Sequence, residues 1–344
     1  MSAKTLSPPA RLVWPDLAKG VGILLMSIGH SAIPSDYLGI WIYSFHMPLF
    51  FFLSGWFFSL REGSVGKTIR HKAFPILMPY VTYSVARWLW DAGASLLAGS
   101  AVDFAPLLGM LLQWPGTPYA GSVWFFTGLF AAECLFALLL KAAGDRPLPL
   151  VGLSFVLAGC AWAYALLGGP RLPWHVDAAC LLLPYLALGH VLRTRWPEPG
   201  KLFPAAPILL CVNVVCTAVN AQFGQGHIDY NLRYVNEFFT CYLAGMAGVA
   251  LCVMLCRRLP DLPPLRFIGE NSAVYYAVGW IGSNIAHSAV RAVWPVSGYP
   301  LLCVHLLGLW LVPVPLILFL RRFCPVLMGR RAGVPPTAET EDLL

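Results

Sequence analysis

The sequence is poor in charged residues. Of its 344 residues only 11% are Asp, Glu, Lys or Arg, whereas 58% are hydrophobic, and the mean hydropathy is +0.68. A water-soluble domain usually carries about 25% charged residues. The deficit therefore excludes an ordinary soluble enzyme. No polar stretch is long enough to form a separate soluble domain beside the apolar ones.

Several motifs with known chemistry are also missing. The chain has no GxGxxG or Walker sequence and no CxxC pair, and no two of its histidines are spaced i, i+4. Its ten cysteines lie mostly in apolar stretches, which is typical of small core residues and predicts neither a metal site nor a disulfide framework. The net charge of +7 is not gathered into an Arg-rich run with interleaved aromatics, so we expect no nucleic-acid partner.

Long hydrophobic runs are what the sequence does contain. A transmembrane helix needs about 20 apolar residues, and ten runs bounded by Pro, Gly or charge approach or exceed that length. They predict an all-α, polytopic membrane bundle of about ten transmembrane helices. The runs are 16–34, 41–60, 73–98, 121–141, 148–167, 177–192, 203–222, 236–256, 268–290 and 299–320. A shorter apolar piece, 104–114, is expected to be re-entrant or interfacial.

The distribution of basic residues predicts an orientation. If the N-terminus is inside, 19 of the 23 Lys and Arg residues fall in or beside inner segments, whereas Arg171, Arg233 and Arg291 fall outside and Arg87 lies in a span. Such a skew follows the positive-inside rule. We expect both termini in the cytoplasm and the protein in the cytoplasmic (inner) membrane. The predicted organisation is a cytoplasmic segment 1–15, a membrane-embedded domain 16–322 and a disordered tail 323–344.

The first span carries ionisable groups that are costly in a membrane. Asp16, Lys19 and His30 all lie in it, and such residues usually have a function. Lys19 and His30 are eleven residues apart, which is three helical turns or about 16 Å, so they share one face. That face suits a long anionic substrate entering from inside. Lys19 as a snorkelling anchor and His30 as a structural histidine are the alternatives.

The second span opens with FHMPLFFFLSG at 45–55, where an imidazole and a proline precede very apolar residues. Because the first span runs outward and the second inward, His30 and His46 are expected at similar depth. One of the two histidines is then a candidate general base.

Other polar residues are candidate contacts. Lys67, Arg70 and Lys72 precede the third span and suit a phosphate-bearing cosubstrate, although an ordinary positive-inside cluster explains them equally well. Trp124 suits a binding wall or an aromatic belt. The candidates for substrate contacts are Asp16, Arg87, Trp124, Glu133 and Asn271.

The motifs together resemble the membrane-bound acyltransferase-3 proteins, and most of all the fucose 4-O-acetylase-like branch. The matching segments are DLAKG at 16–20 with Gly29-His30, FHMPLFFFLSGWFF at 45–58, TIRHKAFPILMPY at 68–80, VWFFTGLF at 123–130 and IGENSAVYY at 268–276. In one departure from the family pattern, Gly279-Trp280 stands about where many similar chains have a histidine.

This resemblance implies an enzyme that moves an acyl group, commonly acetyl, from cytoplasmic acyl-CoA to a hydroxyl of a carbohydrate or lipid-linked acceptor. It implies that His30 is catalytic, with His46 in the matching second motif. Lys19 stands where many members have Arg, and Arg70 and Lys72 are implied to hold the CoA phosphates. Two alternatives from other classes are a carrier or flippase for a small metabolite or lipid, and a structural subunit.

Overall fold

The computed structural model describes residues 12–31, 36–114, 117, 123–144, 146–195, 204–293 and 297–330. Most of the predicted cytoplasmic segment 1–15 and residues 331–344 of the predicted tail lie outside the described residues. The first part of that tail is folded. Residues Pro325–Met328 form a short 3-10 helix, and Met328 is buried.

The described residues form an all-helical protein, with one isolated β-bridge between Asp229 and Tyr234. Helices satisfy their own backbone hydrogen bonds, as the interior of a bilayer requires. The helices are α1 (Trp14–Gly29), α2 (Asp36–Tyr43), α3 (His46–Trp56), α4 (Val65–Leu97), α5 (Ala105–Leu112), α6 (Trp124–Ala143), α7 (Pro147–Leu166), α8 (Val176–Arg195), α9 (Ala206–Asn220), α10 (Phe238–Cys256), α11 (Pro263–Glu270), α12 (Ser272–Arg291), α13 (Gly298–Leu311) and α14 (Pro313–Phe323).

Multiple helices have the length and composition of membrane spans, which confirms an all-α, multi-pass membrane protein. Among the described residues, the six segments that qualify are Asp36–Trp56, Trp124–Ala143, Pro147–Leu166, Pro173–Arg195, Phe238–Cys256 and Gly298–Phe323. The remaining predicted spans overlap α1, α4, α9 and α12. Helices α1 and α9 are short for a bilayer, at 16 and 15 residues. The total of ten spans and the sides of the termini stay predictions.

The second predicted span is broken near its start. Helix α2 ends at Tyr43 and α3 begins at His46, with Ser44 and Phe45 between them. Pro48 has no backbone N–H and is favoured in the first turn of a helix, so the chain restarts its helix just ahead of it. The Ser44 hydroxyl donates to the Trp41 carbonyl, 2.7 Å away, and accepts from the buried Asn213 side chain of α9. The break turns Tyr43 and His46 toward the same region.

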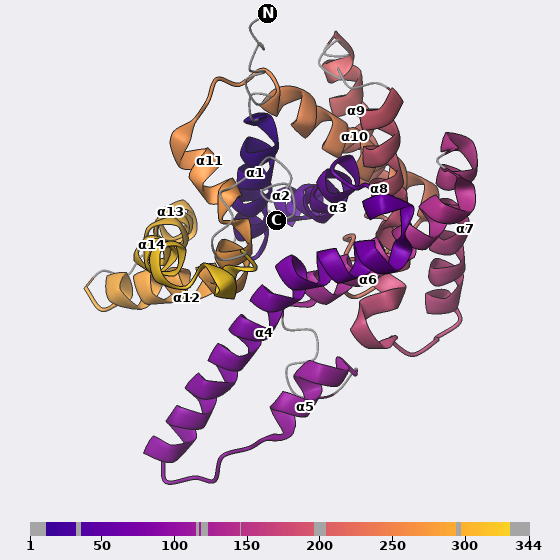
Figure 1. Cartoon of the computed structure of the whole chain (residues 1–344). Coiled ribbons are helices and arrows are strands. Elements are labelled where there is room, and N and C mark those ends of the chain that lie inside the picture. Colours follow the sequence, from indigo (N-terminus) through magenta and orange to yellow (C-terminus); the bar gives the residue numbers. More distant parts are fainter. Residues whose placement is uncertain are drawn as a thin grey trace, which may run out of the picture.

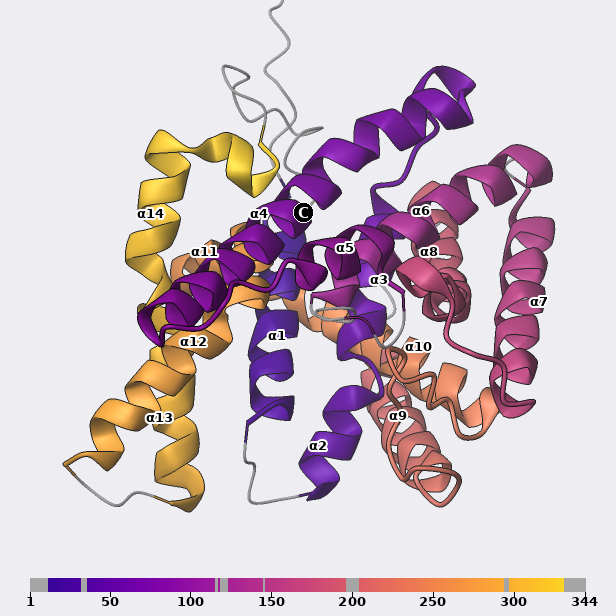
Figure 2. The same ribbon diagram turned by 90° about the horizontal axis from the view of Figure 1, so that it is seen from below.

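Helix α1 occupies the middle of the bundle. Helices α11 to α14 lie on one side of it, and α3, α8, α9 and α10 lie on the other (Figures 1 and 2). Two glycines allow α1 and α11 to touch through their backbones. A Cβ atom on Gly269 would lie 1.8 Å from the Asp16 carbonyl oxygen, and one on Gly20 would lie 2.4 Å from that of Leu265. The motifs at 16–20 and 268–276, distant in sequence, thus pack directly together.

Helix α4 is longer than predicted. It begins at Val65, so Arg70 and Lys72 lie within its first turns, ahead of Pro75. Its far half extends away from the bundle with α5 beside it (Figure 1). The Tyr80 hydroxyl donates to the Met110 carbonyl, and the Gln113 amide donates to the Tyr80 hydroxyl at 2.6 Å. These bonds attach the short apolar helix α5 to α4.

Candidate active site

Two cavities meet along one face of α1. The first, which we call the Lys19 cavity, is an open space of about 590 Å³, a volume that includes solvent. The second, the histidine cavity, is an open space of about 740 Å³ on the same basis. Met26, Met47 and Tyr276 line both, so the two spaces adjoin. From one end to the other, α1 contributes residues 19, 23, 26 and 30, which the helical period places on a single face.

The Lys19 cavity has an apolar body and a polar end. Phe50, Leu53, Phe125 and Phe126 are among its apolar lining, and the polar lining residues are Lys19, Ser54 and Ser272. The Lys19 ammonium is buried and lies 3.9 Å from the Asp16 carboxylate one turn earlier. A long, thin molecule with an anionic end matches this distribution of polarity.

The histidine cavity is lined by both predicted catalytic histidines together with Tyr43. The Tyr43 hydroxyl lies 3.1 Å from Nδ1 of His30. Its ring packs edge-on against His30 and His46, with ring centroids 5.7 and 5.1 Å away. His30 caps the end of α1 and is exposed, whereas His46 is buried. Tyr43 therefore bridges the two imidazoles.

The hydrogen bonds of His46 define its tautomer. Its Nδ1 lies 2.9 Å from the Ile42 carbonyl oxygen, which can only accept, so Nδ1 carries the proton. In the neutral ring, Nε2 then has the free lone pair. His46 is thus arranged to accept a proton or hydrogen bond through Nε2.

A buried ion pair lies behind the wall of the Lys19 cavity. The Lys72 ammonium is 3.1 Å from Oε1 of Glu133, and both side chains are almost fully buried. The Ser54 hydroxyl donates to the same oxygen at 2.5 Å. Lys72 also lies over the Phe58 ring, with 5.2 Å between its nitrogen and the ring centroid. The predicted phosphate contact Lys72 and the predicted substrate contact Glu133 are therefore partners of each other.

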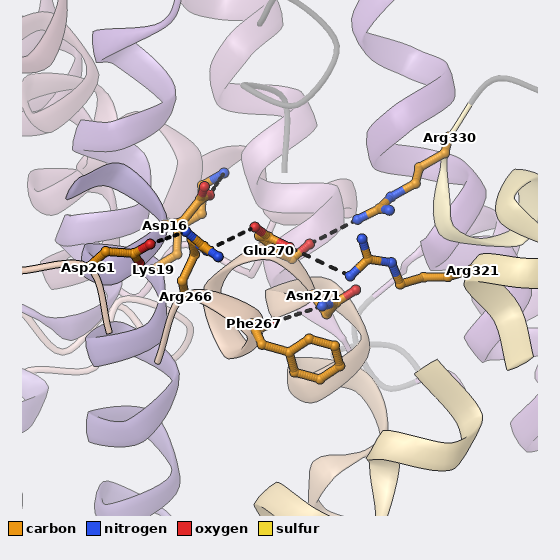
Figure 3. A network of polar contacts seen from close by, with 9 residues as sticks. All are labelled: Asp16, Lys19, Asp261, Arg266, Phe267, Glu270, Asn271, Arg321 and Arg330. Carbon is orange, nitrogen blue, oxygen red and sulfur yellow. Dashed lines mark hydrogen bonds and ion pairs between the residues drawn. The ribbon is translucent and has the colours of Figure 1, made fainter. Parts of the chain in front are cut away.

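A second charged network surrounds Glu270 at the junction of α11 and α12 (Figure 3). Its carboxylate lies 3.6 Å from Nε of Arg266 and 3.6 Å from a terminal nitrogen of Arg321. The Arg330 guanidinium donates to the Glu270 backbone carbonyl at 3.1 Å. Next in sequence, the Asn271 amide donates to the Phe267 carbonyl at 2.7 Å. The network joins α11 to the C-terminal segment. Ser272, which lines the Lys19 cavity, follows Glu270 by only two residues.

Comparison with known families identifies the family of the chain. The family model of an acyltransferase domain, acyltransferase-3, matches residues 12–318. The chain belongs to the acyltransferase-3 family. It is therefore a multi-pass membrane acyltransferase that transfers groups other than aminoacyl groups, and this confirms the predicted family and enzyme class. No curated protein and no solved structure gave a significant match.

In this acyltransferase-3 chain, the predicted site residues fall into two groups. Lys19, His30, His46 and Trp124 line the paired cavities. The others lie outside that lining. Asp16, Lys72, Glu133 and Asn271 are buried beside it, Arg70 is exposed in the second turn of α4, and Arg87 pairs with Asp91 at 3.0 Å on the distant part of α4.

Several polar lining residues of the acyltransferase, among them Tyr43, Asp229 and Tyr276, were not among the sequence candidates. Tyr276 belongs to the IGENSAVYY motif, and Tyr43 stands three residues before His46, so both had a local signal. Asp229 comes from the segment between α9 and α10 and had none. Within the described part of the chain, no three His, Cys, Asp or Glu side chains are grouped as metal ligands would be.

Proposed function

We propose that this acyltransferase moves an acyl group, most simply acetyl, from cytoplasmic acyl-CoA to a hydroxyl of a carbohydrate or lipid-linked acceptor at the cytoplasmic membrane. The observation that supports this is the pair of adjoining cavities, with a buried ammonium at one end and two imidazoles at the other. The thioester arm would occupy the apolar Lys19 cavity, and the acceptor would occupy the histidine cavity.

Basic side chains near the Lys19 cavity suit the phosphates of CoA. Lys19 lines the cavity itself, and Arg70 is exposed on α4. Arg321 and Arg330 reach the same region from the C-terminal segment, held by Glu270. A guanidinium has five N–H donors, so an arginine that contacts Glu270 keeps others for a phosphate. Lys72 is paired with Glu133 behind the cavity wall. From there its positive charge would favour the anionic end of the CoA.

His30 would act as the general base. With Nδ1 donating to the Tyr43 hydroxyl, Nε2 of His30 has the lone pair that takes the proton from the acceptor hydroxyl. The acceptor oxygen forms the ester bond to the thioester carbonyl carbon, and the bond from that carbon to sulfur breaks. The CoA thiolate leaves and takes the proton from the imidazolium. A covalent relay through an acyl-imidazole is the second route open to the same histidine.

Purified protein in detergent tests this proposal through release of free CoA thiol from acetyl-CoA in the presence of candidate acceptors. We expect acceptor-dependent release by the wild type and its loss in His30→Ala. His287→Ala is a matched control, because His287 contacts His305 away from both cavities. A correctly folded His30→Ala protein with full transfer would refute the mechanism. A carrier or flippase would release no CoA at all.

The acceptor can be sought in cells. Mass spectrometry of surface glycans and lipids, with and without the gene, should show an acyl mass that is lost in the deletion strain. Restoration of that mass by the wild type, but not by His30→Ala, would connect the acceptor with the site.

A further inference from the structure

Tyr43 contacts a third histidine besides His30 and His46. The ring of His227, in the segment between α9 and α10, packs edge-on against Tyr43, with 5.4 Å between the ring centroids and 82° between the planes. Unlike the other two histidines, His227 is not among the described residues that line the histidine cavity. Its contact with the site therefore runs through Tyr43.

The neighbours of His227 hold it in place. The Asn236 side-chain amide donates to the His227 carbonyl at 3.2 Å and to Oδ1 of Asn220, on α9, at 3.1 Å. Asn236 has a left-handed backbone, with φ of 59°, which asparagine adopts more readily than most residues. The Tyr234 ring packs edge-on against the His227 ring, with their centroids 6.1 Å apart. The imidazole thus lies in contact with two tyrosine rings, and its backbone is tied to α9.

The segment that carries His227 is itself anchored in the bundle. Asp229 and Tyr234 exchange two backbone hydrogen bonds, of 2.9 and 2.8 Å. Ile228 and Tyr230 are each 2% exposed, and the Tyr230 hydroxyl lies 2.7 Å from that of Tyr185 on α8. A segment fixed by its own backbone bonds and by buried side chains can serve as a support for the ring that it contacts.

Tyr43 needs such a support. It is the last residue of α2, and its hydroxyl must stay within hydrogen-bond distance of Nδ1 of His30, where it lies at 3.1 Å. A side chain can turn between staggered rotamers, and each edge-on aromatic contact favours one ring orientation over the others. The hydrogen bond at one nitrogen of a histidine decides which nitrogen carries the proton. The orientation of the Tyr43 ring therefore bears on the state of His30.

We propose that His227 is a positioning residue for acyl transfer. Its ring holds the Tyr43 phenol against His30, so that Nδ1 of His30 stays protonated and Nε2 keeps the lone pair that accepts the proton of the acceptor hydroxyl. The inference rests on the proposed function, because it concerns the general base named there. His227 acts by the packing of its ring, and neither of its own nitrogens takes part in the reaction.

Kinetics of thiol release from acetyl-CoA test the role of the ring. His227→Ala should lower kcat about tenfold and change KM for acetyl-CoA less than about twofold, because the Lys19 cavity is not involved. His227→Phe keeps an aromatic ring and should restore kcat to within about twofold of the wild type. His227→Leu, a larger variant without a ring, should match His227→Ala and provides a second test if His227→Ala fails to fold. His287→Ala is the control, since it removes a ring contact with His305 elsewhere.

A double variant tests whether His227 acts through Tyr43. Once Tyr43→Phe has removed the hydrogen bond to His30, adding His227→Ala should lower kcat by no more than about a further twofold. Multiplication of the two losses, to about a hundredfold, would show independent roles and overturn the inference. So would a His227→Phe protein as slow as His227→Ala, because a nitrogen of His227 would then be required.

Nuclear magnetic resonance of ¹⁵N-histidine-labelled, full-length protein in detergent tests the geometry without any acyl transfer. The His30 signals are those that disappear in His30→Ala, and about pH 8 keeps an ordinary imidazole neutral. We expect the Nδ1-protonated form of His30 in the wild type and in His227→Phe, and a mixture of both tautomers in His227→Ala. The same tautomer in all three proteins would overturn the inference.

The two measurements separate this inference from the proposed function. A protein whose His30 tautomer depends on the ring at position 227 but which never releases CoA would refute the function and retain the positioning role. Acceptor-dependent release of CoA that is unchanged in His227→Ala would refute the positioning role and retain the function.

Discussion

The hydroxyl of Tyr43 lies 3.1 Å from Nδ1 of His30, and the same ring contacts His46 edge-on. Tyr43 is the last residue of α2, just ahead of the break that precedes α3. The break therefore does more than interrupt a membrane span. It places a phenol where it can hold one imidazole in a single orientation and buttress the other. A general base needs such an orienting partner as well as a suitable nitrogen.

This relationship predicts the behaviour of Tyr43→Phe. The ring contacts remain and only the hydrogen bond to His30 is removed, so the fold should persist while kcat for acyl transfer falls by up to about tenfold. KM for acetyl-CoA should change little, because Tyr43 lines the other cavity. Tyr37→Phe is the control, since Tyr37 is 85% exposed on the same helix. Equal kcat in the two variants would contradict a role for Tyr43.

The buried pair of Lys72 and Glu133 predicts a stability effect. Lys72→Met leaves the Glu133 carboxylate buried without its cation, which should lower the free energy of unfolding by about 3–5 kcal/mol. Adding Glu133→Leu should recover much of this loss, because no unpaired charge remains. Thermal unfolding in detergent measures both variants.

An exposed ion pair at the start of the same helix, between its first turn and the residues just before it, supplies the control. Lys67 pairs with Glu62, and both side chains are more than half exposed. Lys67→Met should therefore cost less than about 1 kcal/mol. If Lys72→Met were as mild as this, the pair would be solvated and Lys72 would be available to CoA.

The contact between α1 and α11 predicts a steric effect at Gly269. A Cβ atom there would lie 1.8 Å from the Asp16 carbonyl oxygen, so Gly269→Ala must push the two helices apart. We expect a loss of about 1–3 kcal/mol of stability and reduced activity, because Lys19 and Ser272 flank this contact. Gly66→Ala, on α4 with nothing within 4 Å, should be neutral or slightly stabilising. Comparison of the two melting temperatures tests the contact.

The network around Glu270 predicts a selective effect on the donor substrate. Arg321→Ala should raise KM for acyl-CoA about tenfold at low salt and less at high salt, since a phosphate contact is charged and screened. Arg322→Ala, the exposed neighbour, should leave KM near the wild-type value. Initial rates at two ionic strengths measure this. An equal rise in both variants would indicate a general charge effect in place of a specific contact.

Much of the fold followed from local patterns. Each predicted span overlaps a helix because apolar runs in a membrane have few alternatives to helix. Lys19 and His30 line adjoining cavities because eleven residues return a helix to the same face. The break after Tyr43 was missed, although Pro48 gave a local sign of it. The pairing of Lys72 with Glu133 had no such sign, since the two residues lie on different helices and are 61 residues apart in sequence.

The sequence by itself determined the membrane bundle, the family and the face of α1 that carries the lysine and the histidine, because these depend on composition and on the helical period. Only the tertiary structure decided which groups meet that face. Asp229 and Asn231 reach His30 across about two hundred residues of chain, on a turn whose position depends on Tyr230 packing against α8. Such contacts are set by the packing of whole helices, and no local pattern encodes them.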